Sequence, residues 1–172
     1  MATLFKECTY RVQGGGRPVI KEHLPAATTI KKGDFVGFSS NSVSLLLAAN
    51  TTYGSADVDT TGANVIYGMA LADSVSTSRP IPVVLCNDHT EFLLPVLHGT
   101  PASAVTATSQ VGAAYDLAHF DTGSVTAWGV TIDDTTGTNV VVTELPSIYP
   151  VGEQYGRVWA KIISGSKDIA VA

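Results

Sequence analysis

The sequence predicts an all-β protein: an antiparallel β-barrel or sandwich preceded by an extended N-terminal arm. Short apolar runs of about four to eight residues recur along the chain between Gly, Asn, Asp and Pro, a pattern typical of strands and turns. Val and Thr, which favour strands, occur twenty times each. No stretch has the length of a crossover helix, so the strands belong to a barrel or sandwich rather than to βαβ units.

The chain divides near residue 30. Residues 1–29 are predicted to form the arm, because Gly14–Gly16 is a flexible breaker and Pro18 and Pro25 exclude a long helix. The alternative is that this segment supplies an N-terminal strand to the same domain. Residues 30–172 are predicted to form the β domain.

Within the β domain, each predicted strand is an apolar run that follows turn residues. In chain order the runs are 34–38, 43–48, 64–67, 68–72, 81–86, 91–97, 113–117, 125–132, 139–143 and 156–163. Residues 42–50 contain three consecutive leucines, so a short helix is an alternative there. Residues 102–110 allow one further helical turn or two.

Composition narrows the class of protein. A chain of 172 residues can bury a core without metal or disulfide support. Charged residues make up only 15%, against about a quarter in soluble domains, which indicates that part of the surface is covered in the working state. Cys8 and Cys86 lie far apart and predict no disulfide framework. No secretory signal or apolar run of ~20 residues is present, so we expect synthesis in the host cytoplasm and no membrane partner.

Charge is distributed unevenly. The net charge of −5 argues against nucleic acid as the main partner, because phosphates favour basic surfaces. Residues 1–32 carry six basic and two acidic side chains, a net +4, whereas the remainder carries four basic and thirteen acidic ones, a net −9. A basic segment on an acidic body is suited to contact an acidic neighbour, including another copy of the chain.

One motif suggests an enzyme. Asp121-Thr122-Gly123 resembles the active-site loop of aspartic proteases, in which two carboxylates share a proton. A retropepsin-like homodimer would take its second carboxylate from the partner. The same residues also form a good β-turn. The motif therefore leaves a dimeric protease using Asp121 as an alternative function.

Metal and cofactor motifs are incomplete. Residues 57–62 begin like a calcium loop, but Gly68 stands where the bidentate Glu is required. Cys86 and His89 are the only close pair of zinc-type ligands, and Cys86 ends an apolar run typical of a core. We therefore expect no catalytic residue, no metal and no cofactor.

Several strand openings resemble those of tailed-phage capsid decoration (cement) proteins of the small β-barrel or β-tulip type. The similar segments are 30–36, which contains Gly-Asp-Phe-Val, then 67–72, 111–117 and 128–133, and 156–162, which contains Gly-Arg-Val. The resemblance implies a non-enzymatic virion protein on the outer capsid surface. Its partners would be the major capsid protein and other copies of itself in a homotrimer.

The resemblance and the basic arm together predict the contact residues. We expect the capsid or a neighbouring copy to be contacted by basic and aromatic side chains of the arm: Phe5, Lys6, Tyr10, Arg11 and Arg17. A phage fibre or carbohydrate-binding β domain is a further alternative. It would use the aromatic residues Trp128, Tyr149, Tyr155 and Trp159.

Overall fold

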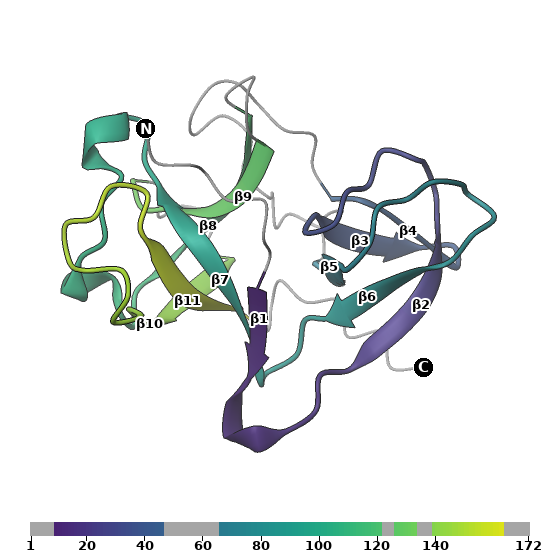
Figure 1. Cartoon of the computed structure of the whole chain (residues 1–172), viewed down its shortest axis with the longest axis horizontal. Helices are drawn as coiled ribbons and strands as arrows, with labels where there is room; N and C mark the ends of the chain where they lie inside the picture. The colour runs from purple at the N-terminus through teal and green to yellow at the C-terminus, as the bar shows by residue number, and fades with distance from the viewer. Residues whose placement is uncertain (1–8, 47–65, 122–125, 134–138, 164–172) are drawn as a thin grey trace.

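The computed structural model describes residues 9–46, 66–121, 126–133 and 139–163. Within these ranges every regular element is a strand, apart from three 3-10 turns of three residues each. The predicted all-β fold is therefore confirmed. The strands build two barrels that lie side by side (Figure 1). No helix in the described ranges has the length and apolarity needed to cross a lipid bilayer.

The N-terminal barrel contains five strands. They are β2 (Ile20–Pro25), β3 (Phe35–Ser39), β4 (Ser42–Leu45), β5 (Gly68–Ala70) and β6 (Ile81–Leu85). Their order is β2-β4-β3-β5-β6, and the pairing of β2 with β6 closes the barrel. Ser40 and Asn41 join β3 to β4 with φ values of 50° and 65°. Two positive φ values in a two-residue loop match the twist of a tight hairpin, which explains the sharp reversal here.

The helix that the leucines of residues 42–50 would allow does not form in the described part of that segment. Ser42–Leu45 is strand β4, with Val43 buried, and residues 47–50 lie outside the described ranges. Pairing with β3 places Val43 in the barrel core, and this burial outweighs the high helix propensity of the leucines that follow. Residues 102–110 contain the 3-10 turns η2 (Pro101–Ser103) and η3 (Thr108–Gln110).

The C-terminal barrel is a six-stranded sheet that closes on itself. Its strands are β1 (Thr9–Val12), β7 (Thr90–Leu97), β8 (Ala114–Asp121), β9 (Thr126–Thr131), β10 (Val140–Glu144) and β11 (Arg157–Ile162). The order is β1-β7-β11-β10-β8-β9, and a short parallel pairing of β7 with β9 completes the ring. A Cβ at Gly129 would lie 2.7 Å from the carbonyl oxygen of Pro95. Only glycine permits this close approach, so Gly129 is required where the barrel closes.

Residues of the predicted arm are part of both barrels. β1 pairs with residues 90–93 of β7, the part of that edge which β9 does not reach. β2 pairs with β6 and belongs to the N-terminal barrel. Among residues 9–25 the structure therefore shows two paired strands, β1 and β2, rather than a wholly extended arm. The physical reason is that the backbone edges of β7 and β6 would be left without these hydrogen-bonded partner strands.

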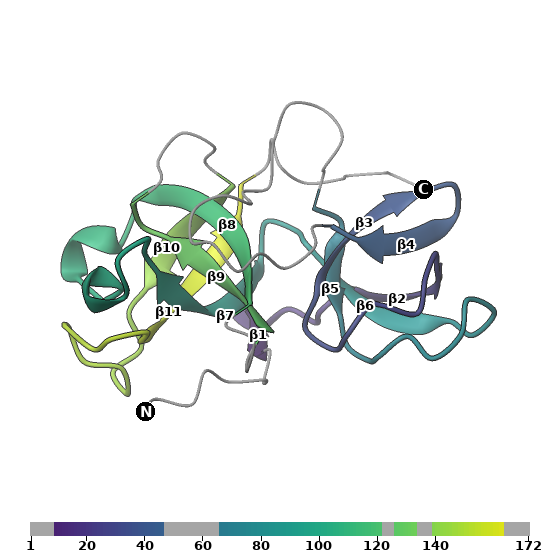
Figure 2. The ribbon, with the colours of Figure 1, turned by 90° about the horizontal axis from the view of Figure 1, so that it is seen from above.

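The two barrels share one apolar core at their junction. Phe35, Met69 and Val84 are cross-strand neighbours that face away from the interior of the N-terminal barrel. They are buried in the same cluster as Phe92 and Trp128 of the C-terminal barrel. The Phe35 ring centre lies 5.0 Å from Phe92 and 5.4 Å from Trp128, edge to face. Figure 2 shows the two barrels meeting at this region.

Candidate docking surface

Two of the residues predicted to contact a partner, Tyr10 and Arg11, lie in β1. The Tyr10 side chain is half-buried and packs against the shared core. Arg11 donates hydrogen bonds to Glu91 and Glu144, each at 2.5 Å, and its guanidinium carbon lies 4.2 Å above the Trp159 ring. Burial alone would lower the pKa of Arg11, but the hydrogen bonds to the two carboxylates outweigh it and raise that pKa. Both side chains therefore hold β1 on the sheet.

The remaining predicted contact residues have a different status. Arg17 lies between β1 and β2 and is exposed, so it is available to a partner. Phe5 and Lys6 lie outside the described residues. The predicted set is thus not brought together as one surface within the part of the chain that the structure describes.

The motifs of the enzyme and metal alternatives fall largely outside the described ranges. Residues 122–124 of the Asp-Thr-Gly-Ser string and residues 57–62 of the calcium-like loop are not described. Cys86 is buried in the core, whereas His89 is exposed at the surface. In the described ranges, no three His, Cys, Asp or Glu side chains are grouped to hold a metal ion.

The aromatics of the carbohydrate alternative occupy different surroundings. Trp128 is buried at the barrel junction, and Trp159 lies under the Arg11 guanidinium. Tyr155 packs against the small apolar cluster around Phe120. Tyr149 is half-buried in the connection between β10 and β11. The structure does not bring these rings together as a stacking platform.

A different surface stands out at the end of the C-terminal barrel that is farthest from the N-terminal barrel (Figure 1). It is built from residues 99–112, between β7 and β8, and residues 146–152, between β10 and β11, and we call it the charge-free face. Neither segment contains Asp, Glu, Lys, Arg or His. The first belongs to a longer stretch, residues 92–115, whose only titratable side chains are His98 and Tyr115.

Thr106 joins the two segments of the charge-free face. Its side chain is buried, and its hydroxyl donates to the carbonyl of Pro150 at 2.6 Å and accepts from the amide of Glu153 at 3.2 Å. Its backbone adds bonds to the carbonyl of Glu153 and from the amide of Gly152, at 3.1 and 2.7 Å. One threonine thus fixes the path of the exposed loop.

Apolar side chains project from this fixed loop. Ile148 and Val151 are 73% and 61% exposed, and Val111 on the other segment is 44% exposed. Exposed apolar side chains that gather on neighbouring loops are a feature of surfaces that meet another molecule. The fixed backbone means that little conformational entropy would be lost on docking.

Replacing Thr106 by valine tests how firmly this loop is held. Valine keeps the shape but removes the hydroxyl, so the Pro150 carbonyl and the Glu153 amide keep only their 3.1 Å hydrogen bond to each other. We expect the free energy of unfolding to fall by about 2 kcal/mol, measured by denaturant titration. Thr108→Val, at an exposed site on the same segment, is the matched control and should change it by less than about 0.5 kcal/mol. Equal values for the two variants would contradict the role of Thr106.

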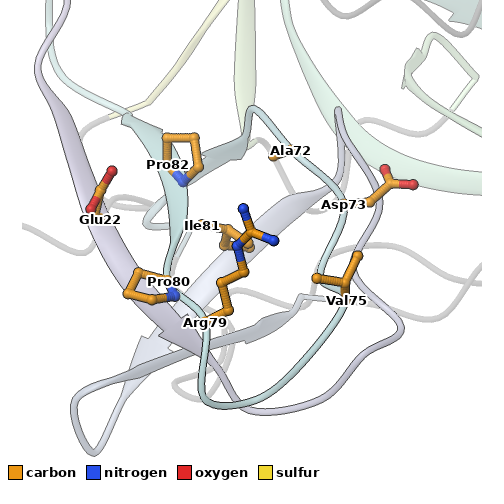
Figure 3. Close-up of a pocket in the computed structure, with 8 residues that line it drawn as sticks. All are labelled: Glu22, Ala72, Asp73, Val75, Arg79, Pro80, Ile81 and Pro82. Atoms are coloured by element: carbon orange, nitrogen blue, oxygen red, sulfur yellow. The ribbon is translucent and has the colours of Figure 1, made fainter.

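The N-terminal barrel carries one open pocket of about 560 Å³ (Figure 3). Its lining combines three charged residues, Glu22, Asp73 and Arg79, with the apolar residues Ala72, Val75, Pro80, Ile81 and Pro82. Asp73 accepts a hydrogen bond from the Lys32 amide at 2.8 Å and pairs with Lys31 at 3.8 Å. No Ser, Thr, Cys or His lines this pocket, and the carboxylates of Glu22 and Asp73 are the nucleophile types that its lining holds.

Comparison of the chain with protein-family models, curated proteins and solved structures gives no match.

The charge-free face was missed at the level of the sequence, although a signal was present. A run of 24 residues without Asp, Glu, Lys or Arg precedes Asp116. Its apolar and small polar residues by themselves predict only strands and turns. Residues 146–152 complete the charge-free face because Thr106, more than 40 positions earlier in the chain, binds the backbone of this loop.

Proposed function

We propose that this chain is a structural protein that binds the outer surface of an assembled phage capsid and stabilises it by clamping neighbouring capsid subunits. The observation that carries the proposal is the charge-free face, with Ile148 and Val151 held out on a fixed loop. A surface without charges avoids the desolvation cost that buried ions impose at a protein contact. Ile148 and Val151 provide exposed apolar surface that such a contact would bury.

The major capsid protein is the proposed partner of the charge-free face. Other copies of the chain, arranged as a homotrimer, would surround the same capsid position. The rest of the surface is acidic beyond residue 32, which suits it to face solvent rather than nucleic acid. Many copies on one shell act together, so a modest contact per copy is sufficient.

Buried ionisable side chains also support a structural role over catalysis. Glu91 binds Arg11 and Gln13, and Asp34 accepts from the Trp128 indole. Each of these contacts joins two strands or the two barrels of the fold. Catalytic groups would instead converge on a cavity that substrate can enter.

The direct test of the proposal is the copy number of the chain in purified phage particles from the source lysate. Quantitative mass spectrometry would compare it with the major capsid protein. We expect a ratio near one, or a fixed simple fraction of one. Absence from particles, or only a few copies per particle, would overturn the proposal.

The docking role of the charge-free face has its own test. In the double variant Ile148→Asp, Val151→Asp, two charges would have to be buried at the contact. We expect its affinity for capsids lacking the chain to fall at least about 100-fold, measured by co-sedimentation.

The matched control for this test is Val75→Asp, which changes a valine that is 67% exposed on the N-terminal barrel. It should retain affinity within about threefold of the unchanged protein. Circular dichroism checks that all variants are folded. Equal loss in the double variant and the control would show that the charge-free face is not the docking surface, even if particle composition supports the capsid proposal.

A further inference from the structure

Three side chains meet where the two barrels join: Asp34, His119 and Trp128. Asp34 immediately precedes β3 of the N-terminal barrel, whereas His119 and Trp128 are cross-strand partners on β8 and β9 of the C-terminal barrel. All three residues are less than one-tenth exposed. A carboxylate from one barrel therefore lies buried against an imidazole and an indole from the other.

The contacts within this cluster are specific. The Trp128 indole donates to Asp34 Oδ1 at 3.2 Å, and His119 Nε2 lies 3.8 Å from the same oxygen. Asp34 Oδ2 accepts from the Lys31 amide at 2.7 Å. The His119 and Trp128 rings are stacked, with centres 4.3 Å apart and planes 7° apart.

Few other charges act on the Asp34 carboxylate. The Asp34 carboxylate faces His119 on β8, and it is also influenced by the Asp73 carboxylate in the connection after β5. The side chain of Lys31 is exposed and pairs with Asp73 rather than with Asp34. Trp128 on β9 and Phe35 on β3 are uncharged. Burial is the largest influence on the pKa of Asp34 and raises it, and the Asp73 carboxylate also raises it. The hydrogen bond from the Lys31 backbone, the His119 ring and the hydrogen bond from Trp128 act in the opposite direction.

We propose that the Asp34–His119–Trp128 cluster is a proton-binding latch, in which uptake of a proton by Asp34 tightens the junction between the two barrels. A proton on the Asp34 carboxyl group removes the buried negative charge from the junction. The indole contact and the ring stack remain in place, because neither requires an ionised carboxyl group. The latch is independent of the proposed capsid function.

The sign of the effect follows from proton linkage. Because the pKa of Asp34 is raised in the folded chain above its ordinary value of 3.8, the folded state binds the proton at a higher pH than the unfolded state. The contribution of Asp34 to stability therefore increases as the pH falls through the folded pKa. The gain is complete below the ordinary pKa and absent well above the folded one.

Trp128 provides a built-in reporter of this latch. In a Trp159→Phe background, Trp128 is the single tryptophan of the chain. We expect its emission to follow a one-proton titration curve with its midpoint above 3.8, and the curve to disappear in Asp34→Asn. The folding equilibrium constant of the unchanged protein should rise relative to Asp34→Asn as the pH falls, about tenfold per unit by which the pKa is raised.

The matched control is Asp133→Asn, because Asp133 forms the second aspartate–histidine contact, 3.6 Å from His98, at an exposed site. This variant should keep the titration curve of Trp128. Carbon-13 NMR of the Asp34 carboxyl in the unmutated chain gives a second measurement that requires no variant to fold. A midpoint at or below 3.8, or emission that does not change with pH, would overturn the latch.

Discussion

Replacing Arg11 by alanine is expected to lower the free energy of unfolding by about 3 kcal/mol, measured by denaturant titration. The reason is the Glu91 carboxylate, whose side chain is 1% exposed and which is bound by Arg11 and Gln13. Without the guanidinium, a buried negative charge would keep only the Gln13 amide among its described partners. β1 would also lose its contact with Trp159.

Two further variants separate the buried charge from a general loss of contacts. Arg17→Ala removes an exposed arginine close in sequence and should change stability by less than about 0.5 kcal/mol. Adding Glu91→Gln to Arg11→Ala should recover part of the loss, because the uncompensated charge is removed. If Arg11→Ala is as stable as Arg17→Ala, the Arg11–Glu91 contact does not hold β1 on the sheet.

Replacing Phe35 by alanine is expected to lower the free energy of unfolding by about 3–5 kcal/mol. Phe35 is fully buried and belongs to the N-terminal barrel, yet its ring packs edge to face against Phe92 and Trp128 of the other barrel. Its removal would open a cavity at the junction. Amide hydrogen exchange should accordingly quicken in both barrels, not only around β3.

Phe35→Leu is the conservative companion, since it keeps most of the buried volume, and we expect a loss below about 2 kcal/mol. Phe38→Ala is the local control. Phe38 stacks on Tyr67 with ring centres 4.9 Å apart within the N-terminal barrel, so its removal should quicken exchange there alone. Identical exchange patterns for Phe35→Ala and Phe38→Ala would contradict a shared core between the barrels.

Most strands could be predicted from local composition. The runs at 34–38, 81–86 and 91–97 correspond within about a residue to β3, β6 and β7, because each has apolar residues bounded by turn residues. The buried state of Cys86 was predicted on the same grounds. In these segments the local signal and the tertiary structure agree.

The strands near the N-terminus could not be predicted in the same way. β1 contains Tyr10 and Arg11 among polar neighbours, and β2 exposes Ile20 and Leu24, so neither has the apolar run of a core strand. β1 and β2 form because they pair with the edges of β7 and β6. β1 is also held by Arg11, which binds the buried carboxylate of Glu91 some 80 residues away. Glycines and prolines around them instead indicated an arm.

The charge-free face and the latch likewise depend partly on the sequence pattern and partly on contacts that only the tertiary structure creates. The sequence by itself determined the all-β class, the rhythm of strands and the absence of charge along residues 92–115. Only the tertiary structure decided that there are two barrels, that residues 146–152 lie against Thr106, and that Asp34 meets His119. Strand formation follows from local side-chain pattern, whereas the partners of a buried charge or hydroxyl are set by packing between segments far apart in the chain.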